Sequence, residues 1–214
     1  LKDLPSKSWK NIEVPLGDEQ YQIYREIALR GKRGGKGAAL GAIQQLLIVS
    51  AHPFALGRVS SAGKKPAGDI CPKMEATLGV LQEVKEAGEK AIIFTDFKAV
   101  QRILQNEIRR RFGIWTDVIN GEITSNRQAI IDIFSEKEGF NVIILGHQVG
   151  GVGLNITAAN HVIHYTRPWN PAKENQATDR VHRIGQERPV TVYYPIVTDE
   201  KFTTVEKRLD ELIQ

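Results

Sequence analysis

The chain has 214 residues, of which 41% are hydrophobic and 25% are charged, and its formal net charge is +4. This length and composition predict one ordinary globular domain with a real core, or such a domain with an appended helical segment. The single cysteine, Cys71, excludes an internal disulfide and a cysteine-rich zinc site, and no apolar run is long enough for a membrane span.

The basic excess lies in the first part of the chain. Residues 1–85 carry 13 Lys and Arg against 8 Asp and Glu, whereas residues 86–214 carry 16 against 17. The positive charge is densest in residues 25–37, which we predict to form a glycine-rich basic loop. Such a loop suits contact with a phosphate backbone, and a solvated linker is an equally good interpretation.

Residues 1–88 are predicted to form a mainly helical entry segment. Acidic residues at positions 18 and 19 and a basic residue at Arg30 match the two ends of a helix dipole. The residue before Pro53 resists helical backbone, which ends a second helix, and Pro72 suits the first turn of a third. The expected helices span residues 18–30, 38–50 and 72–84, with a loop over residues 57–69.

Residues 89–214 are predicted to form an α/β domain. Short apolar runs indicate strands at residues 91–95, 114–119, 141–145, 161–165 and 190–197. The expected helices span residues 97–111, a segment from an N-cap at Thr124 or Ser125 to Phe134, a segment from Asn170-Pro171 onward, and residues 199–212. Strands that alternate with helices imply right-handed crossovers, and hence a parallel sheet with helices on both faces.

Ligands of a parallel sheet bind at the carboxyl ends of its strands, so we expect the functional residues in the loops that follow them. A phosphate-binding loop of the pattern G-x-x-x-x-G-K-[ST] is missing, because residues 31–37 and 57–65 lack the hydroxyl residue or the spacing. Asp199-Glu200 follows a strand, as a metal-binding acidic pair does, but we interpret it as a helix N-terminus. We therefore predict that the chain alone does not hydrolyse ATP.

Two arginines, Arg180 and Arg183, are predicted to share one face of a helix, because they lie three residues apart. Guanidinium groups at such a place fit a transferring phosphoryl group, whose oxygens gather charge in the transition state. An isolated pair of this kind is usually a surface salt-bridge partner. The odd spacing of His161 and His164 puts them on opposite faces of a strand, which disfavours a metal site.

The sequence around the arginines, QATDRVHRIGQ at residues 176–186, resembles motif VI of the Swi/Snf family of helicase-like ATPases in superfamily two. Its HRIGQ ending is distinctive, because RNA helicases of the DEAD-box type have a further arginine in place of Gln186. Other segments resemble the family in the same order: IIFTDF at 92–97 resembles motif IV, residues 149–159 resemble motif V, and WNP at 169–171 resembles its extension. Gln20 to Tyr24 and His52-Pro53 resemble the helical segment that enters this lobe.

The resemblance implies a RecA-like C-terminal lobe that works with an N-terminal RecA-like lobe of the same polypeptide on ATP and double-stranded DNA. The other lobe is expected to hold most of the ATP and the Mg²⁺, and Arg180 and Arg183 are the expected catalytic residues of this one. The expected ATP-binding residues are Gly151, Gly153, Asp179, Arg180 and Arg183. The expected DNA-binding residues are Asn120, Gly121, Arg127, Gln148, Gly150 and Trp169, although Trp169 is equally well interpreted as packing under the next helix.

Residues 146–149 (GHQV) depart from the Ser/Thr and Lys that the family commonly has before the double glycine, and Thr166-Arg167-Pro168 stands where an acidic residue often follows. Short connecting segments favour a bacterial, archaeal or minimal member, and hence the cytoplasm or nucleoid; a eukaryotic protein would be nuclear. Two alternatives stay open: an ATP-independent nucleic-acid-binding or regulatory domain, and a strand-separating helicase of the same superfamily.

Overall fold

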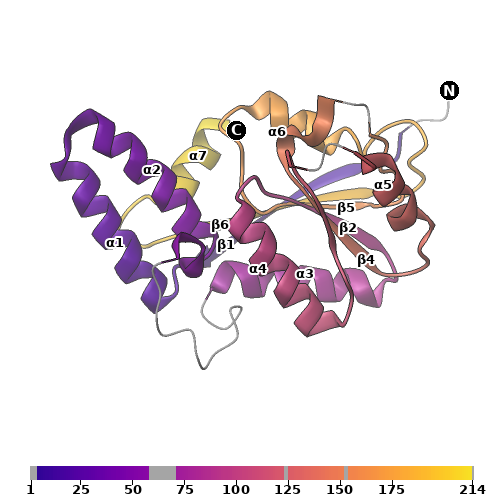
Figure 1. Ribbon diagram of the computed structural model, residues 1–214, viewed down its shortest axis with the longest axis horizontal. Coiled ribbons are helices and arrows are strands. Elements are labelled where there is room, and N and C mark those ends of the chain that lie inside the picture. Colours follow the sequence, from indigo (N-terminus) through magenta and orange to yellow (C-terminus); the bar gives the residue numbers. More distant parts are fainter. Residues whose placement is uncertain (1–3, 58–70, 123–124, 152–153, 214) are drawn as a thin grey trace.

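The computed structural model describes residues 4–57, 71–122, 125–151 and 154–213, so nearly all of the expected loop at 57–69 lies outside the described residues. Figure 1 shows a sheet flanked by helices. The elements are β1 (Lys7–Pro15), α1 (Asp18–Arg33), α2 (Gly35–Ala51), η1 (Pro53–Leu56), α3 (Pro72–Glu86), β2 (Lys90–Phe94), α4 (Lys98–Phe112), β3 (Asp117–Ile119), α5 (Arg127–Glu136), β4 (Asn141–Leu145), η3 (His147–Gly151), β5 (His161–His164), α6 (Pro171–Thr178), β6 (Val190–Thr198) and α7 (Val205–Ile213).

The strands form one sheet in the order β1-β6-β5-β2-β4-β3, and every pairing is parallel. Helices α3 and α4 cover one face, and α5, α6, Val149 and residues 154–159 cover the other (Figure 1). The side chains of β4 are all buried, as a strand covered on both faces requires. The expected parallel α/β fold is confirmed.

Strand β1 is a correction to the expectation that residues 1–88 are mainly helical. It pairs with β6 along its whole length, from Lys7 opposite Val190 to Pro15 opposite Thr198. Only Val14 of this edge strand is buried, so β1 lacks the apolar run that marks the other strands. Strand β1 is thus part of the sheet, and α3 covers one face of the sheet. The division of the chain into two parts at residue 88 stays a prediction.

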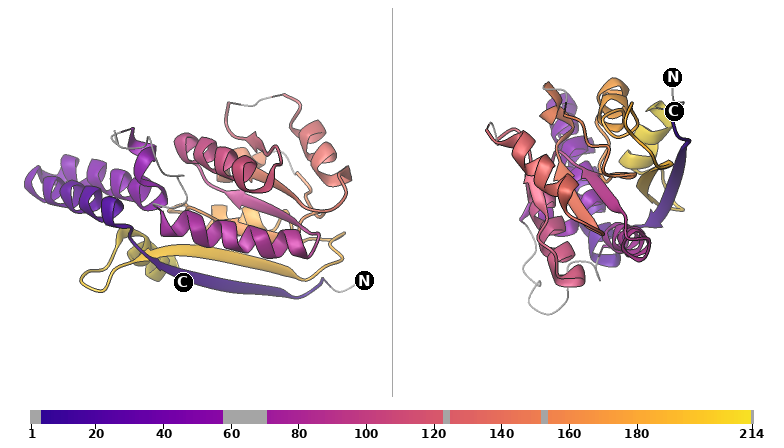
Figure 2. Two further views of the ribbon diagram at one scale, coloured as in Figure 1. Left: turned by 90° about the horizontal axis from the view of Figure 1, so that it is seen from below. Right: turned by 90° about the vertical axis from the view of Figure 1, so that its right-hand side faces the viewer.

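Helices α1 and α2 form a hairpin that projects beyond one end of the sheet (Figure 2). Residues 25–37 are not a loop, as the glycines suggest, because α1 continues to Arg33 and α2 begins at Gly35. The reversal is made at Gly34 and at Gly35, whose φ of 77° lies in the left-handed region that glycine permits. The basic side chains of this segment therefore project from helices.

Gly31 sets how closely α1 approaches α2, because a Cβ at this position would lie 2.5 Å from the Cβ of Ala42. We expect Gly31→Ala to lower the free energy of unfolding by about 1–3 kcal/mol. Gly41→Ala on α2 is the matched control: nothing lies within 4 Å of its added Cβ, and we expect it to raise that free energy by about 0.5–1 kcal/mol. Urea unfolding measures both, and the same sign for both variants would contradict close packing at Gly31.

A third cluster of buried side chains joins the hairpin to β1 and α7. The ring of Tyr24 stacks on Phe202 at 5.5 Å, and its hydroxyl accepts a hydrogen bond from the Val205 backbone at 2.8 Å. A separate buried ion pair joins α3 to α7: the Lys73 ammonium contacts the Glu206 carboxylate at 2.5 Å. The contacts of Tyr24 fix the hairpin to the segment that follows β6.

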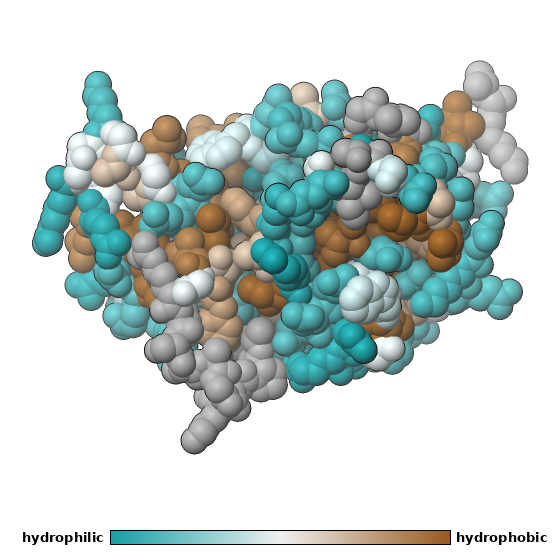
Figure 3. Space-filling model, viewed as in Figure 1, coloured by the Kyte–Doolittle hydropathy of each residue, from teal (hydrophilic) through white to brown (hydrophobic). Residues whose placement is uncertain are grey.

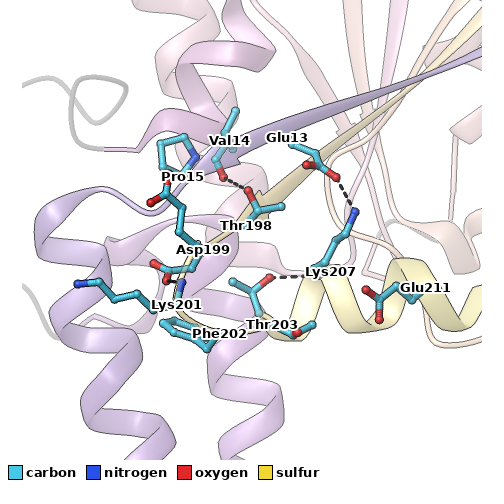
Figure 4. A pocket seen from close by; sticks show the side chains of 12 residues that line it. Glu13, Val14, Pro15, Thr198, Asp199, Lys201, Phe202, Thr203, Lys207 and Glu211 are labelled. Carbon is cyan, nitrogen blue, oxygen red and sulfur yellow. Dashed lines mark hydrogen bonds and ion pairs between the residues drawn. The ribbon is translucent and has the colours of Figure 1, made fainter.

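Two helices begin later than expected. The N-cap of α5 is Asn126 with φ 61°, not Ser125, and Thr124 lies outside the described residues. Helix α7 begins at Val205, because the Thr204 hydroxyl accepts a hydrogen bond from the Lys207 backbone at 3.1 Å and so caps the helix. Asp199 lies before it in a turn, where its carboxylate accepts a hydrogen bond from the Lys201 backbone at 2.8 Å (Figure 4). The interpretation of Asp199-Glu200 as a helix N-terminus is therefore wrong.

Among the described residues, no helix has both the length and the apolar character that crossing a membrane requires.

Candidate functional site

The carboxyl edge of the sheet brings together several residues expected to bind DNA. Since the strands are parallel, the ends of β5, β2, β4 and β3 lie side by side in that order. Asp96 follows β2, Gly146 follows β4 and Asn120 follows β3. The backbone of Gly146 donates to the carbonyl of Ile119 at 3.0 Å, which holds the two neighbouring loops together.

The side chain of Asn120 shapes its own loop. Its amide nitrogen donates to the Gln101 side chain at 2.9 Å, and its oxygen accepts from the Glu122 backbone at 3.0 Å. The turn leaves Gly121 exposed, and Arg127, half-buried, begins α5 a few residues later. Contact of these residues with DNA stays a prediction. In this prediction, the two hydrogen bonds of Asn120 hold its loop in the position from which it contacts DNA.

Gln148 and Trp169 line one groove of about 500 Å³ between the carboxyl edge and α2. Apolar side chains gather between the hairpin and the sheet in the view of Figure 3. Leu40 of α2 lines this groove and is 73% exposed, and Lys173 of α6 adds a cation to it. Trp169 is 58% exposed, so it does not pack as a buried residue under α6.

Arg167, which also lines this groove, is engaged within the fold. Its guanidinium contacts both oxygens of Glu174 at 2.7 Å and the carboxylate of Asp210. Its Cζ atom lies 4.5 Å from the centre of the Tyr194 ring. A guanidinium paired with two carboxylates is a poor candidate for a phosphate contact, and this departure from the family pattern therefore serves to join β5, α6 and α7.

The described residues of the segment that resembles motif V pack against one face of the sheet. Gly150 and Gly151 lie in η3, and Gly153 lies outside the described residues. Beyond it, Leu154 and Ile156 are buried. The backbone of Ile156 donates to the carbonyl of Arg180 at 3.1 Å, and this bond brings the expected ATP-binding segments together.

Arg180 and Arg183 do not share a helix face, which corrects the sequence expectation: α6 ends at Thr178 and both arginines lie in the turns that follow. Arg180 is only 8% exposed. Its Nη1 atom is buried, and no described residue provides it with a hydrogen-bond partner. Burial lowers the pKa of this guanidinium from its ordinary value. The site therefore holds a cationic donor that is ready for an anion.

The two other charged residues of this turn are accessible. Arg183 is exposed. Asp179 has a 63% exposed side chain and lies 3.8 Å from the Lys7 ammonium, a contact that links α6 to β1. The roles of Asp179 and Arg183 toward ATP stay predictions, and so does that of Arg180.

A chain of hydrogen bonds that leads from the exposed Asp96 into the core was missed by the sequence reasoning. The carboxylate of Asp96 contacts His147 Nδ1 at 3.1 Å, His147 Nε2 contacts His164 Nδ1 at 3.2 Å, and His164 Nε2 contacts the Thr178 hydroxyl at 2.9 Å. Burial tends to raise the pKa of Asp96, but the hydrogen bonds from His147 hold it below its ordinary value. The position of His147 two residues after β4, in the segment that departs from the family, is the one signal the sequence offers.

Comparison with known proteins agrees with this architecture. Residues 72–185, more than half of the chain, match the family described as helicase conserved C-terminal domain, and the chain belongs to that family. Within it, the chain is the C-terminal lobe of a Snf2-type helicase. It matches the Sulfolobus solfataricus SWI2/SNF2 ATPase core in complex with dsDNA over 99% of its length, with a TM-score of 0.80 and 30% identity, and covers 44% of that chain.

Two curated relatives are similar over most or all of the chain. The chain is 39% identical over its whole length to Zorya protein ZorD of Escherichia coli. It is 29% identical over 92% of its length to nuclear protein STH1/NPS1 of Saccharomyces cerevisiae. It spans 21% of the first protein and 16% of the second. The expected resemblance to Swi/Snf ATPases and the RecA-like fold are confirmed.

Proposed function

We propose that the chain is the C-terminal motor lobe of an ATP-dependent translocase that moves along double-stranded DNA and displaces or remodels protein–DNA complexes. The single observation that carries this proposal is Arg180. A buried guanidinium with an unpaired donor is costly in a free lobe, and a phosphate group brought by a second lobe compensates it. Arg183, exposed on the same turn, supplies the second positive charge.

In this proposal ATP binds between the two lobes. As the resemblance to the family implies, we assign Mg²⁺ and the phosphate-binding loop to the other lobe. Arg180 and Arg183 stabilise the charge that gathers on the transferring phosphoryl group. Hydrolysis then opens the lobes, and alternating grip on the DNA backbone moves the duplex.

The DNA surface is the carboxyl edge with the groove at Trp169 and Gln148. Contacts with phosphate oxygens position a protein on DNA without reading its sequence, so binding is expected to be sequence-independent and to weaken with salt. The alternative of a regulatory module without ATP use is disfavoured by the intact arginine turn. A strand-separating helicase would respond to single strands as well.

ATP hydrolysis by the intact protein tests the proposal, measured against increasing duplex DNA. We expect strong stimulation by duplex, weak stimulation by single strands, and an about three- to tenfold higher DNA concentration for half-maximal stimulation in Trp169→Ala. Trp115→Ala is the matched control, because Trp115 is also 58% exposed but lies before the amino end of β3, away from the carboxyl ends of the strands. Equal effects of the two tryptophan variants would contradict the assigned DNA surface. An ATP hydrolysis rate that does not change with added DNA would contradict the proposal of a DNA translocase.

A further inference from the structure

The chain of hydrogen bonds from Asp96, which is exposed, through the buried His147 and His164 to Thr178 connects the two ends of the proposed machinery. Its first members lie at the carboxyl edge, where His147 begins η3 and is followed by the exposed Gln148. Its last member, Thr178, ends α6 directly before the arginine turn. We propose that Asp96, His147, His164 and Thr178 form a positioning relay that couples DNA contact at η3 to the placement of Arg180. This inference rests on the proposed function, which puts DNA at one end of the relay and ATP at the other.

The first end of the relay is fixed to η3 through both the backbone and the side chain of one residue. The backbone of His147 donates to Asp96 Oδ1 at 2.7 Å, while its ring contacts Asp96 Oδ2. The His147 side chain is fully buried, although Gln148 beside it is exposed. A DNA phosphate that binds Gln148 and displaces it therefore also displaces the buried ring of His147.

The centre of the relay is a column of stacked rings. The ring centroids of His147 and His164 lie 5.4 Å apart, with 12° between the ring planes. The ring centroids of His164 and Tyr194 also lie 5.4 Å apart, with 10° between the planes. Phe94 stacks on both histidines. Since close-packed interiors transmit displacement and do not absorb it, a shift of His147 is passed to His164.

At the other end, Thr178 holds the arginine turn. Its hydroxyl meets His164, and its carbonyl accepts hydrogen bonds from the backbones of Val181 at 3.0 Å and His182 at 3.1 Å. Arg180 lies inside this turn, and Arg183 follows it. The position of the Thr178 backbone therefore sets the direction in which the Arg180 guanidinium points.

The donors and acceptors of the relay match in one continuous direction. Burial lowers the pKa of His164 well below its ordinary value, so His164 is neutral and carries one N–H. In the neutral form of His147, its Nδ1–H donates to Asp96, its Nε2 accepts from His164 Nδ1–H, and His164 Nε2 accepts from the Thr178 hydroxyl. Each bond fixes the next one, so loss of any member leaves a buried polar group without a partner.

The relay is tested by a substitution that keeps shape and removes one hydrogen bond. In the intact protein we expect Thr178→Val to lower the maximal DNA-stimulated ATPase rate about tenfold, while the DNA concentration for half-maximal stimulation stays unchanged. Thr178→Ser keeps the hydroxyl and should restore most of the rate. The control is Thr77→Val on α3, where a hydroxyl that is equally out of solvent donates to the Lys73 carbonyl at 2.9 Å on the opposite face of the sheet.

The outcomes separate the relay from the function on which it rests. A normal rate in Thr178→Val, or an equal loss in Thr77→Val, overturns the relay, and loss of the rate together with DNA affinity does so as well. If Arg180→Met keeps full activity, the proposed function itself fails. If Thr178→Val does not fold, His164→Asn gives a second break, because asparagine cannot reach both His147 and Thr178, and it must show the same separation of rate from DNA affinity.

Discussion

Replacement of Arg180 by methionine is expected to abolish DNA-stimulated ATP hydrolysis and, at the same time, to stabilise the protein. The rate should fall by about three to five orders of magnitude, as when a phosphate-contacting arginine is removed. The free energy of unfolding should rise by about 1–2 kcal/mol, because an apolar side chain of similar length replaces a guanidinium whose Nη1 atom is buried without a partner.

Arg183→Met is the comparison for Arg180→Met. Arg183 is exposed, so its removal should also reduce turnover but change the free energy of unfolding by no more than about 0.5 kcal/mol. Steady-state ATPase assays and thermal unfolding of the intact protein give the two readouts. If Arg180→Met lowers the ATPase rate but raises the free energy of unfolding, unfolding is excluded as the cause of the lost activity. A destabilised Arg180→Met would contradict the unpaired guanidinium, and full activity would contradict its role.

The strands at the centre of the sheet could be predicted because each is a short apolar run. Strands β2 and β4 are buried on both faces, and such strands need no alternation of polar and apolar residues. Strand β1 could not be predicted in this way: its outer side chains face solvent, and its place beside β6 depends on a partner about 180 residues away. Local pattern does not carry information about such a partner.

The site was predicted from motif chemistry, and its geometry was not. Arginines three residues apart suggest a helix face, but α6 ends at Thr178, where the backbone carbonyl accepts bonds from a tight turn. That turn is what separates a buried Arg180 from an exposed Arg183. Likewise, His147 and His164 meet only because β4 and β5 flank β2 in the sheet. Their contact is a product of strand order, which the sequence shows only after the fold is assembled.

The largest loss of stability is expected from breaking the ion pair between Lys73 and Glu206. Their side chains are 1% and 9% exposed and lie 2.5 Å apart. Glu206 also accepts a hydrogen bond from the Val197 backbone at 2.9 Å, so the pair joins α3, α7 and β6. Lys73→Met removes the cation and leaves a buried carboxylate, which should lower the free energy of unfolding by about 3–5 kcal/mol.

A second substitution distinguishes the charge from the packing. Lys73→Met combined with Glu206→Gln should recover much of the loss, because glutamine is neutral and still accepts the Val197 hydrogen bond. Lys73→Met with Glu206→Leu should recover less, since that backbone donor loses its acceptor. Arg111→Met breaks the more exposed pair with Glu75 and should cost less than about 1 kcal/mol. Urea unfolding of the four variants measures these differences. If Lys73→Met alone behaves like Arg111→Met, the junction of α3, α7 and β6 is held by apolar packing and not by this pair.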